Sequence, residues 1–339
     1  MSAKDKPHPL DFSKMKFISR AERGHKVDVS ALGRTPQPGS SFQDWFDSLP
    51  GFLAAEELRR VVTAIVAARA VRKPVVLACG GHVVKTGCSP LLIDLMERGV
   101  ITALATNGSV AIHDLELAET GSTSEEVGDT IRDGRFGMVQ ETCERMNAAA
   151  ARGAEEGRGL GRALGELLNE TKAQYRNLSL FASAARLGIP ATVHVAIGTD
   201  TVHMHPEADG AALGRATLTD FRLLCGIVAE LGSSEPGQAG GVWLNVGSAV
   251  VMPEVFLKAV SVARNLGHPL KGMHTANLDM LRHYRPTQNV IARPVEPGCG
   301  HALIGPHEIL LPLLRQAIVE KSAAPPAPAK SQSGMMTPG

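Results

Sequence analysis

The sequence alternates short apolar runs that end in glycine-rich turns with longer amphipathic segments, and this alternation limits the fold more than any other feature. The first full unit joins an apolar run at 74–78 to a second run at 101–105 through a helical segment at 89–98. Strands that alternate with helices in this way are typical of a parallel sheet with crossover helices. The sequence therefore predicts an α/β protein with a doubly wound, mostly parallel sheet and helices on both faces.

The alternation continues along most of the chain, without an internal repeat. A long helical region rich in Glu, Arg and Ala is interrupted by glycines around Gly157. The further predicted elements are helices at 56–70, 124–185, 218–230, 253–265 and 308–319, and strands at 191–195 and 241–246.

The two ends of the chain differ from the body in composition. Residues 1–48 are rich in Pro, Gly and charge, which favours an arm that becomes ordered only by packing on the body or on a neighbouring subunit. Residues 322–339 carry too little apolar surface to fold, so we expect a disordered tail. The body at 49–321 then forms one domain.

Charge and cysteine content exclude several classes of protein. Thirty-five basic residues stand against 34 acidic ones, a net charge of +1, which leaves no electrostatic footprint for nucleic acid or for an anionic membrane. The five cysteines are odd in number and contain no C-x-x-C pair, so neither a disulfide framework nor a cysteine zinc site is expected. No secretory signal or spanning segment is seen, and we expect a cytoplasmic protein.

Ligands of an open parallel sheet bind beyond the carboxyl ends of its strands, so the turns there are the first candidates for a site. The turn at 79–87, CGGHVVKTG, has paired glycines that would let backbone N–H groups approach a pyrophosphate, although it is not a G-x-G-x-x-G fingerprint and also suits a tight turn without a ligand. The turn at 106–114 holds Gly108 and Ser109, which could lie under a nucleotide, followed by the titratable pair His113 and Asp114. The alternative interpretation of this second turn is a helix cap with polar groups at the surface and no ligand.

Two further turns are rich in polar groups. The segment at 194–206 holds three histidines and Asp200, and a His-x-His pair on a strand would place His203 and His205 on one face to bind a metal. A polar pocket in which Asp200 faces a cation is the favoured interpretation, with no metal. The paired segments at 245–254 and 274–279 hold another phosphate-compatible turn and Glu254, which could bind an amine or complement a helix dipole.

Taken in order, these segments resemble the deoxyhypusine synthase family over roughly 75–318. The segments that carry the resemblance are VLACGGHVVKTG, LLIDLMERGVITALATNG, IPATVHVAIGTDTVHMH, GVWLNVGSAVV, HTANLD and ALIGPHEILLPLL. The resemblance implies a Rossmann-like NAD-binding fold, a tetramer with sites at subunit interfaces, and an N-terminal arm that packs across a neighbour. It also implies that an amine or amino-acid substrate meets His113, Asp114, His203 and Glu254. NAD would lie across Gly81, His82, Val83, Thr106, Asn107, Gly108, Asp200, Thr275 and Ala276.

One departure from the family removes its named reaction. Members of the family hold the aminobutyl group as an imine on a lysine shortly before the last strand, whereas the corresponding stretch here, 284–298, contains no lysine. Arg293 lies nearest that position, but a guanidinium stays protonated and cannot form an imine. Lys85, Lys258 and Lys271 could substitute, although each has a simpler role as a helix-end or surface charge.

The leading hypothesis is an NAD-dependent enzyme that removes hydride from a carbon bearing nitrogen or oxygen. His113 would be the general base, with Asp114 or Asp200 orienting it or pairing with a cationic substrate. The alternatives are an ornithine-cyclodeaminase-like enzyme, a non-catalytic NAD-binding protein, and a zinc or iron hydrolase that uses His203 and His205.

Overall fold

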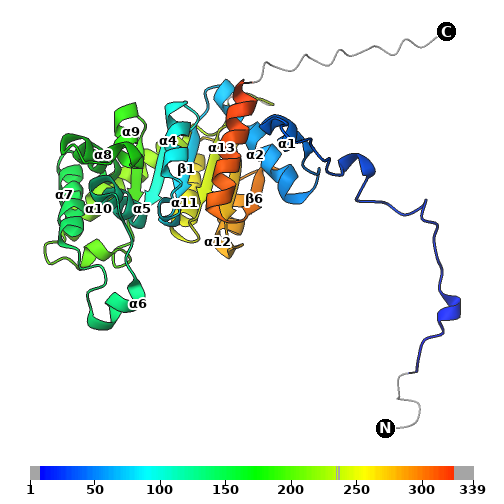
Figure 1. The fold of residues 1–339 in the computed structure, drawn as a ribbon, viewed down its shortest axis with the longest axis horizontal. Coiled ribbons are helices and arrows are strands. Elements are labelled where there is room, and N and C mark those ends of the chain that lie inside the picture. The colour runs from blue at the N-terminus through cyan, green and yellow to red at the C-terminus, as the bar shows by residue number, and fades with distance from the viewer. Residues whose placement is uncertain (1–7, 234, 236, 324–339) are drawn as a thin grey trace.

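The computed structural model describes residues 8–233, 235 and 237–323, and its centre is a six-stranded sheet (Figure 1). The strand order is β3-β2-β1-β4-β5-β6, and every neighbouring pair is parallel. The strands are β1 Val75–Cys79, β2 Ala103–Asn107, β3 Ala191–His194, β4 Val242–Val246, β5 His274–Asp279 and β6 Gly300–Ile304. The predicted α/β fold with a parallel sheet is confirmed.

Both faces of the sheet are buried, and β1 shows the apolar pattern that such a position favours. In β1, Val75 and Leu77 pack into one hydrophobic cluster, while Val76 and Ala78 pack into the other. Successive side chains of a strand point to opposite faces, so a continuous apolar run is what a strand between two helical layers requires. The sheet is therefore doubly wound, as predicted.

The helices form a layer on each face of the sheet. One layer contains α2 Leu53–Ala70, α4 Ser89–Glu97, α5 Gly108–Thr120, α7 Gln140–Glu155, α8 Leu160–Glu170, α9 Leu180–Leu187 and α13 His307–Ala323. The other contains α11 Val251–Asn265 and the second half of α10 Gly210–Ala229. Its centre is a stacked pair of rings, Trp243 of β4 and Phe256 of α11, with centroids 4.1 Å apart.

Short elements complete the described part of the chain. They are α1 Phe42–Ser48, α3 His82–Lys85, α6 Val127–Thr130, α12 Tyr284–Pro286, the 3-10 helices η2 Phe12–Lys14, η3 Val29–Ala31, η4 Ile131–Asp133, η5 Arg176–Leu178 and η6 Thr201–Met204, and the π-helix η7 Thr287–Ala292. Across the residues that the structure describes, no helix is both long enough and apolar enough to span a membrane.

The predicted break around Gly157 is confirmed, because left-handed backbone at Gly157 and Gly159 separates α7 from α8. Other boundaries differ from the predicted ones. The region at 124–185 also contains the short elements α6, η4 and η5 and the separate helix α9, and α10 begins at Gly210, before the predicted start at 218. The predicted turn at 106–114 is mostly helix, since α5 begins at Gly108. The predicted turn HTANLD is the strand β5.

The N-terminal segment runs away from the body in Figure 1, and the side chains at 8–30 are exposed. Only its last part packs on the body, where α1 lies against α13. An arm that packs across a neighbouring subunit therefore stays a prediction. The predicted tail lies outside the described residues from position 324 onward, and α13 continues to Ala323.

The register of the sheet sets the edge where a site can form. Cys79 is level with Thr106 on one side and with Val246 on the other, and Val246 is level with Leu278. The residues that follow this level, including Gly80, line the carboxyl edge of the sheet.

Candidate active site

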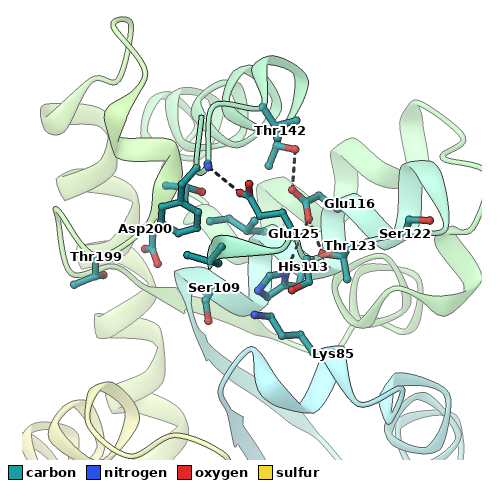
Figure 2. A pocket seen from close by; sticks show the side chains of 17 residues that line it. Lys85, Ser109, His113, Glu116, Ser122, Thr123, Glu125, Thr142, Thr199 and Asp200 are labelled. Atoms are coloured by element: carbon teal, nitrogen blue, oxygen red, sulfur yellow. Dashed lines mark hydrogen bonds and ion pairs between the residues drawn. The ribbon is translucent and has the colours of Figure 1, made fainter. Parts of the chain in front are cut away.

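A cavity of about 420 Å³ opens beyond the carboxyl ends of β2 and β3 (Figure 2). This volume is within the range of small-molecule sites in proteins. Its walls come from α5, from the segment between α5 and α7, and from the loop that follows β3. The polar lining residues are Lys85, Ser109, His113, Glu116, Ser122, Thr123, Ser124, Glu125, Thr142, Thr199, Asp200 and Thr201.

His113 lies on the face of α5 that lines this cavity. The side chain of Asn107 caps α5 by accepting a hydrogen bond of 3.3 Å from the Val110 N–H, so the helix begins at the end of β2 and His113 falls in its second turn. Nδ1 of His113 is 2.8 Å from Oγ1 of Thr123. Burial, reinforced by the positive charge of Lys85, lowers the pKa of His113 to about 4. The imidazole is therefore neutral near physiological pH.

Glu116 lies one turn along α5 from His113 and joins the same set of hydrogen bonds. Oε2 accepts from the Thr123 hydroxyl at 2.5 Å, and Oε1 accepts from the Thr142 hydroxyl at 3.1 Å. Oε2 is also 3.9 Å from Nδ1 of His113. A histidine, a threonine and a glutamate thus form one connected chain at the cavity wall.

Asp200 packs directly onto the start of α5. A Cβ atom on Gly108 would lie 2.0 Å from Oδ2 of Asp200, so only glycine fits there. The helix dipole favours a negative charge at this end of α5, whereas burial raises the pKa of the Asp200 carboxyl. The carboxylate therefore lies against the backbone at the first residue of α5.

His203 supports the loop that carries Asp200. Its Nδ1 accepts hydrogen bonds from the Gly198 N–H at 3.1 Å and from the Asp200 N–H at 3.3 Å. Its Nε2 lies 3.9 Å from Oδ2 of Asp200 and, among the residues that the structure describes, has no hydrogen-bond partner although it is buried. His203 therefore binds the backbone of the Asp200 loop and does not line the cavity.

The turn after β1 touches the same site. A Cβ atom on Gly81 would lie 2.5 Å from Oγ of Ser109 and 3.0 Å from Cδ2 of His113. The structure therefore brings together Gly81, Gly108, His113 and Asp200, which the sequence places on three separate turns.

The crevice between β1 and β4, where the strand order reverses, is filled by the protein itself. A Cβ atom on Gly80 would lie 2.1 Å from the carbonyl oxygen of Gly247, and one on Gly247 would lie 3.3 Å from Val83 and 3.0 Å from His307. His82 packs its ring edge-on against His307, with centroids 5.4 Å apart. The open space at the carboxyl edge therefore lies on the β2 side of this crevice.

Asp114 was expected to orient His113, and its position argues against that role. Its buried carboxylate accepts hydrogen bonds from the Ser179 hydroxyl, from the Leu180 N–H at 2.7 Å and from the Phe181 N–H at 3.3 Å, at the start of α9. Burial raises its pKa to about 6. Consecutive residues of a helix point about 100° apart, so a neighbour in sequence faces elsewhere.

Four residues expected to contact the cofactor, Val83, Thr106, Thr275 and Ala276, are fully buried in the protein. The Thr106 hydroxyl donates to the carbonyl oxygen of Thr192 at 3.3 Å. Thr275 and Ala276 are fully buried near the start of β5, and the Thr275 hydroxyl donates to the carbonyl oxygen of Val290 at 2.6 Å. Thr275 precedes Leu278 by three residues, which is about 10 Å from the edge at the rise of a strand.

Glu254 lies in the first turn of α11, outside the lining of the His113 cavity. It pairs with Lys258 and with Arg285, whose Nε is 3.3 Å from Oε1. The side-chain amide of Asn289 also donates to Oε1 at 2.9 Å. These contacts lower the pKa of Glu254, beginning with the hydrogen bond from Lys258.

The two histidines considered for a metal do not lie on a strand. His203 belongs to the 3-10 helix η6, and His205 follows it with Nδ1 accepting from the Glu207 N–H at 3.3 Å. Within residues 8–233, 235 and 237–323, no group of three or more His, Cys, Asp or Glu side chains is arranged to hold a metal ion.

The lysine-free stretch at 284–298 forms α12 and η7, where Arg293 donates to Oδ1 of Asn289 at 2.8 Å. Of the three lysines considered as substitutes, Lys258 is paired with Glu254 and Lys271 lies in the turn before β5. Lys85 is the one that lines the cavity, and Figure 2 shows it extending toward His113.

Sequence reasoning missed Glu116 and Thr123. The spacing from His113 to Glu116 would have revealed the first, because residues three apart on a helix are neighbours, but the segment was interpreted as a turn. Thr123 follows the left-handed Gly121 that ends α5, and no sequence signal places that loop beside the helix it leaves.

No family model and no curated protein matches the sequence. Solved structures do match in fold. The ternary complex of AgrE with ornithine and NAD+ has a TM-score of 0.50 and 13% identity, covering 78% of this chain and 33% of that chain. A conserved protein from Methanococcus maripaludis S2, assigned to the LOR/SDH group, has a TM-score of 0.49 and 14% identity, with coverages of 80% and 71%.

A protein assigned as a deoxyhypusine synthase from Entamoeba histolytica has a TM-score of 0.47 and 13% identity, with coverages of 86% and 97%. This chain spans about a third of the length of AgrE. The likeness at these identities is one of fold.

Proposed function

We propose that this protein is an NAD-dependent enzyme that removes hydride from a carbon bearing nitrogen or oxygen in a small amine or amino acid. The observation that carries the proposal is the neutral, hydrogen-bonded His113 in a cavity whose lining includes hydroxyl and charged side chains, at the carboxyl edge of a parallel sheet. Ligands of such sheets bind at this edge. The fold shared with AgrE, which was solved with NAD+ and ornithine, supports the choice of cofactor.

The residues around the cavity fit the nucleoside part of NAD. Asp200 offers a buried carboxylate as an acceptor for ribose hydroxyls, the role an acidic residue plays in dinucleotide-binding folds. Because Gly108 has no side chain, the Asp200 carboxylate lies directly against the start of α5, and Gly81 makes room in the same way for Ser109 and His113. Lys85 supplies a cation for the pyrophosphate, which the Asp200 carboxylate would repel from the start of α5. When bound, NAD would accept the hydride.

In this proposal His113 takes a proton from the amine or hydroxyl of the substrate. A pKa of about 4 makes the imidazole a weaker base than usual, but it also keeps the ring unprotonated at neutral pH. Asp200 pairs with a cationic group of the substrate or with ribose, and His203 holds the Asp200 loop in place. Asp114 and Glu254 receive no catalytic role.

An ornithine-cyclodeaminase-like activity is the second candidate, because AgrE was crystallised with ornithine as well as NAD+. The cavity also offers the carboxylates of Asp200 and Glu125 to a substrate with two amino groups. Release of ammonia from ornithine without accumulation of reduced nicotinamide would identify this reaction. NAD binding without turnover of any amine would leave only a binding role.

The test is His113→Ala, compared with His268→Ala, which changes an exposed histidine outside the site. Loss of a general base typically lowers the rate about 10²- to 10⁴-fold, so turnover should fall by this amount in His113→Ala alone. Affinity for NAD should change little, since the substituted ring has a proton-transfer role. Turnover retained by His113→Ala would remove the assignment.

A further inference from the structure

We infer that Glu116 and Thr123 are positioning residues that fix the proton of His113 on Nδ1 and leave Nε2 as the basic nitrogen. The catalytic consequence of this inference rests on the proposed function. The tautomer of His113 itself is a property of the protein without substrate. Its basis is the chain of hydrogen bonds from His113 through Thr123 to Glu116.

The direction of this chain follows from counting protons. An ionised carboxylate only accepts hydrogen bonds, and a threonine hydroxyl has one proton to donate. Because Thr123 donates that proton to Oε2 of Glu116, its oxygen can only accept from His113. Nδ1 of His113 must then carry the hydrogen, and Nε2 has the lone pair.

Nε2 is also the nitrogen that a ligand can reach. Among the described residues, Nε2 of His113 has no hydrogen-bond partner. It is also absent from the set of fully buried polar atoms that lack a partner, so the atom is accessible. The ring lines the cavity, with its Cδ2 edge close to Gly81. The tautomer therefore presents an acceptor to the cavity.

Two charges near the ring act in opposite directions on the protonation of His113. Lys85, across from α5, opposes a positive charge on His113, while Glu116, on the same helix, stabilises it. Asp200 and Glu125 also line the cavity, so their carboxylates face the same space. Of these groups, Glu116 is linked to the ring through the Thr123 hydroxyl. Its negative charge stabilises the positive charge that the ring acquires when Nε2 is protonated.

A purely structural role for these groups makes a different prediction. The hydroxyls of Thr123 and Thr142 both bind Glu116 and tie neighbouring segments to α5. If they act only as ties, Thr123→Val and Thr142→Val should have similar effects. If the relay operates, only Thr123→Val releases Nδ1 of His113.

The experiment measures the tautomer of His113 by ¹⁵N NMR in the full chain, with the resonances assigned by their loss in His113→Gln. We expect Nδ1–H in the wild type, loss of this preference in Thr123→Val, and its return in Thr123→Ser. Thr142→Val should keep it. Glu116→Gln should lower the pKa of His113 further, because the stabilising charge is gone, whereas Glu119→Gln, one turn away and paired with Arg145, should leave that pKa unchanged.

An Nε2–H tautomer in the wild type, or an unchanged Nδ1–H in Thr123→Val, would overturn the inference. The wild-type spectrum decides even if Thr123→Val does not fold. Where a substrate is turned over, Thr123→Val should lower kcat about ten-fold with little change in KM and shift the acidic limb of the pH profile. Absence of turnover in the wild type would count against the proposed function alone, because the tautomer is read without substrate.

Discussion

His113 and Asp114 are adjacent in the chain but face different parts of the molecule. His113 points into the cavity, whereas Asp114 points into the core and caps α9 through Leu180 and Phe181. A carboxylate that satisfies the first N–H groups of a helix stabilises that helix and the contacts it makes. One position on α5 thus separates a side chain that lines the cavity from one that packs in the core.

Asp114→Ala should therefore lower the free energy of unfolding rather than the rate of turnover. Loss of its buried hydrogen bonds leaves the α9 N–H groups unsatisfied, and the expected cost is about 2 to 4 kcal/mol in the free energy of unfolding. Urea denaturation measures this change. Turnover by the fraction that stays folded at low temperature should remain near that of the wild type. Unchanged stability combined with lost turnover would return Asp114 to the site.

At the scale of elements, Asp220 of α10 joins two neighbouring elements. Its Oδ2 accepts from the Gly161 N–H at 3.0 Å, at the start of α8, and from the Val193 N–H of β3 at 2.8 Å. A Cβ atom on Gly159 would lie 1.9 Å from Oδ1, so no side chain fits at that position. Burial raises the pKa of Asp220 to about 7, which means that ionising it weakens the fold.

This junction makes a pH-dependent prediction. The folded protein holds the Asp220 proton up to about pH 7, whereas the unfolded chain releases it near 3.8, so the group contributes stability at low pH that is lost as pH rises toward 7. Asp220→Asn keeps an acceptor oxygen and removes the titration. Between about pH 5 and pH 8, the wild type should lose about 3 kcal/mol relative to Asp220→Asn. Parallel stability curves for the two proteins would contradict this account.

The elements that could be predicted from sequence are those whose burial follows a simple pattern. The helix predicted at 56–70 is α2, and the apolar strand predicted at 74–78 is β1. β5 escaped prediction because its polar residues are satisfied inside the sheet, where Asn277 accepts a hydrogen bond of 2.7 Å from the Asn245 amide. Such a partner lies on another strand, and no local pattern reveals it.

The candidate site was predictable only in part for the same reason. Glycine-rich strand ends indicated the edge of the sheet at which the cavity lies, and His113 and Asp200 are among the residues that line it. The motif HTANLD suggested a contact for Thr275, but a short motif does not reveal where a strand begins. The contact between Thr123 and His113 joins a loop residue to the helix that precedes this loop, so only the folded chain brings it about.

At the scale of the whole molecule, the site lies to one side of the sheet's centre. The loops after β1 and β4 close on each other, because Gly80 and Gly247 are in contact, and the cavity opens instead between α5 and the loop after β3. In the proposed function, the residues of this cavity, including Lys85 from the turn after β1, would hold the cofactor. Asp200, at the start of α5, is the residue on which this arrangement depends most.

Calorimetric titration of NAD+ into the full chain measures whether the protein binds this cofactor and whether Asp200 contributes to the affinity. We expect saturable binding, weakened about 10- to 100-fold in Asp200→Asn, since a hydrogen bond to a charged group contributes about 1.5 to 3 kcal/mol. Glu207→Gln, an exposed change in the same loop, should bind as the wild type does. No saturable heat with the wild type, or equal affinity in Asp200→Asn, would contradict the account.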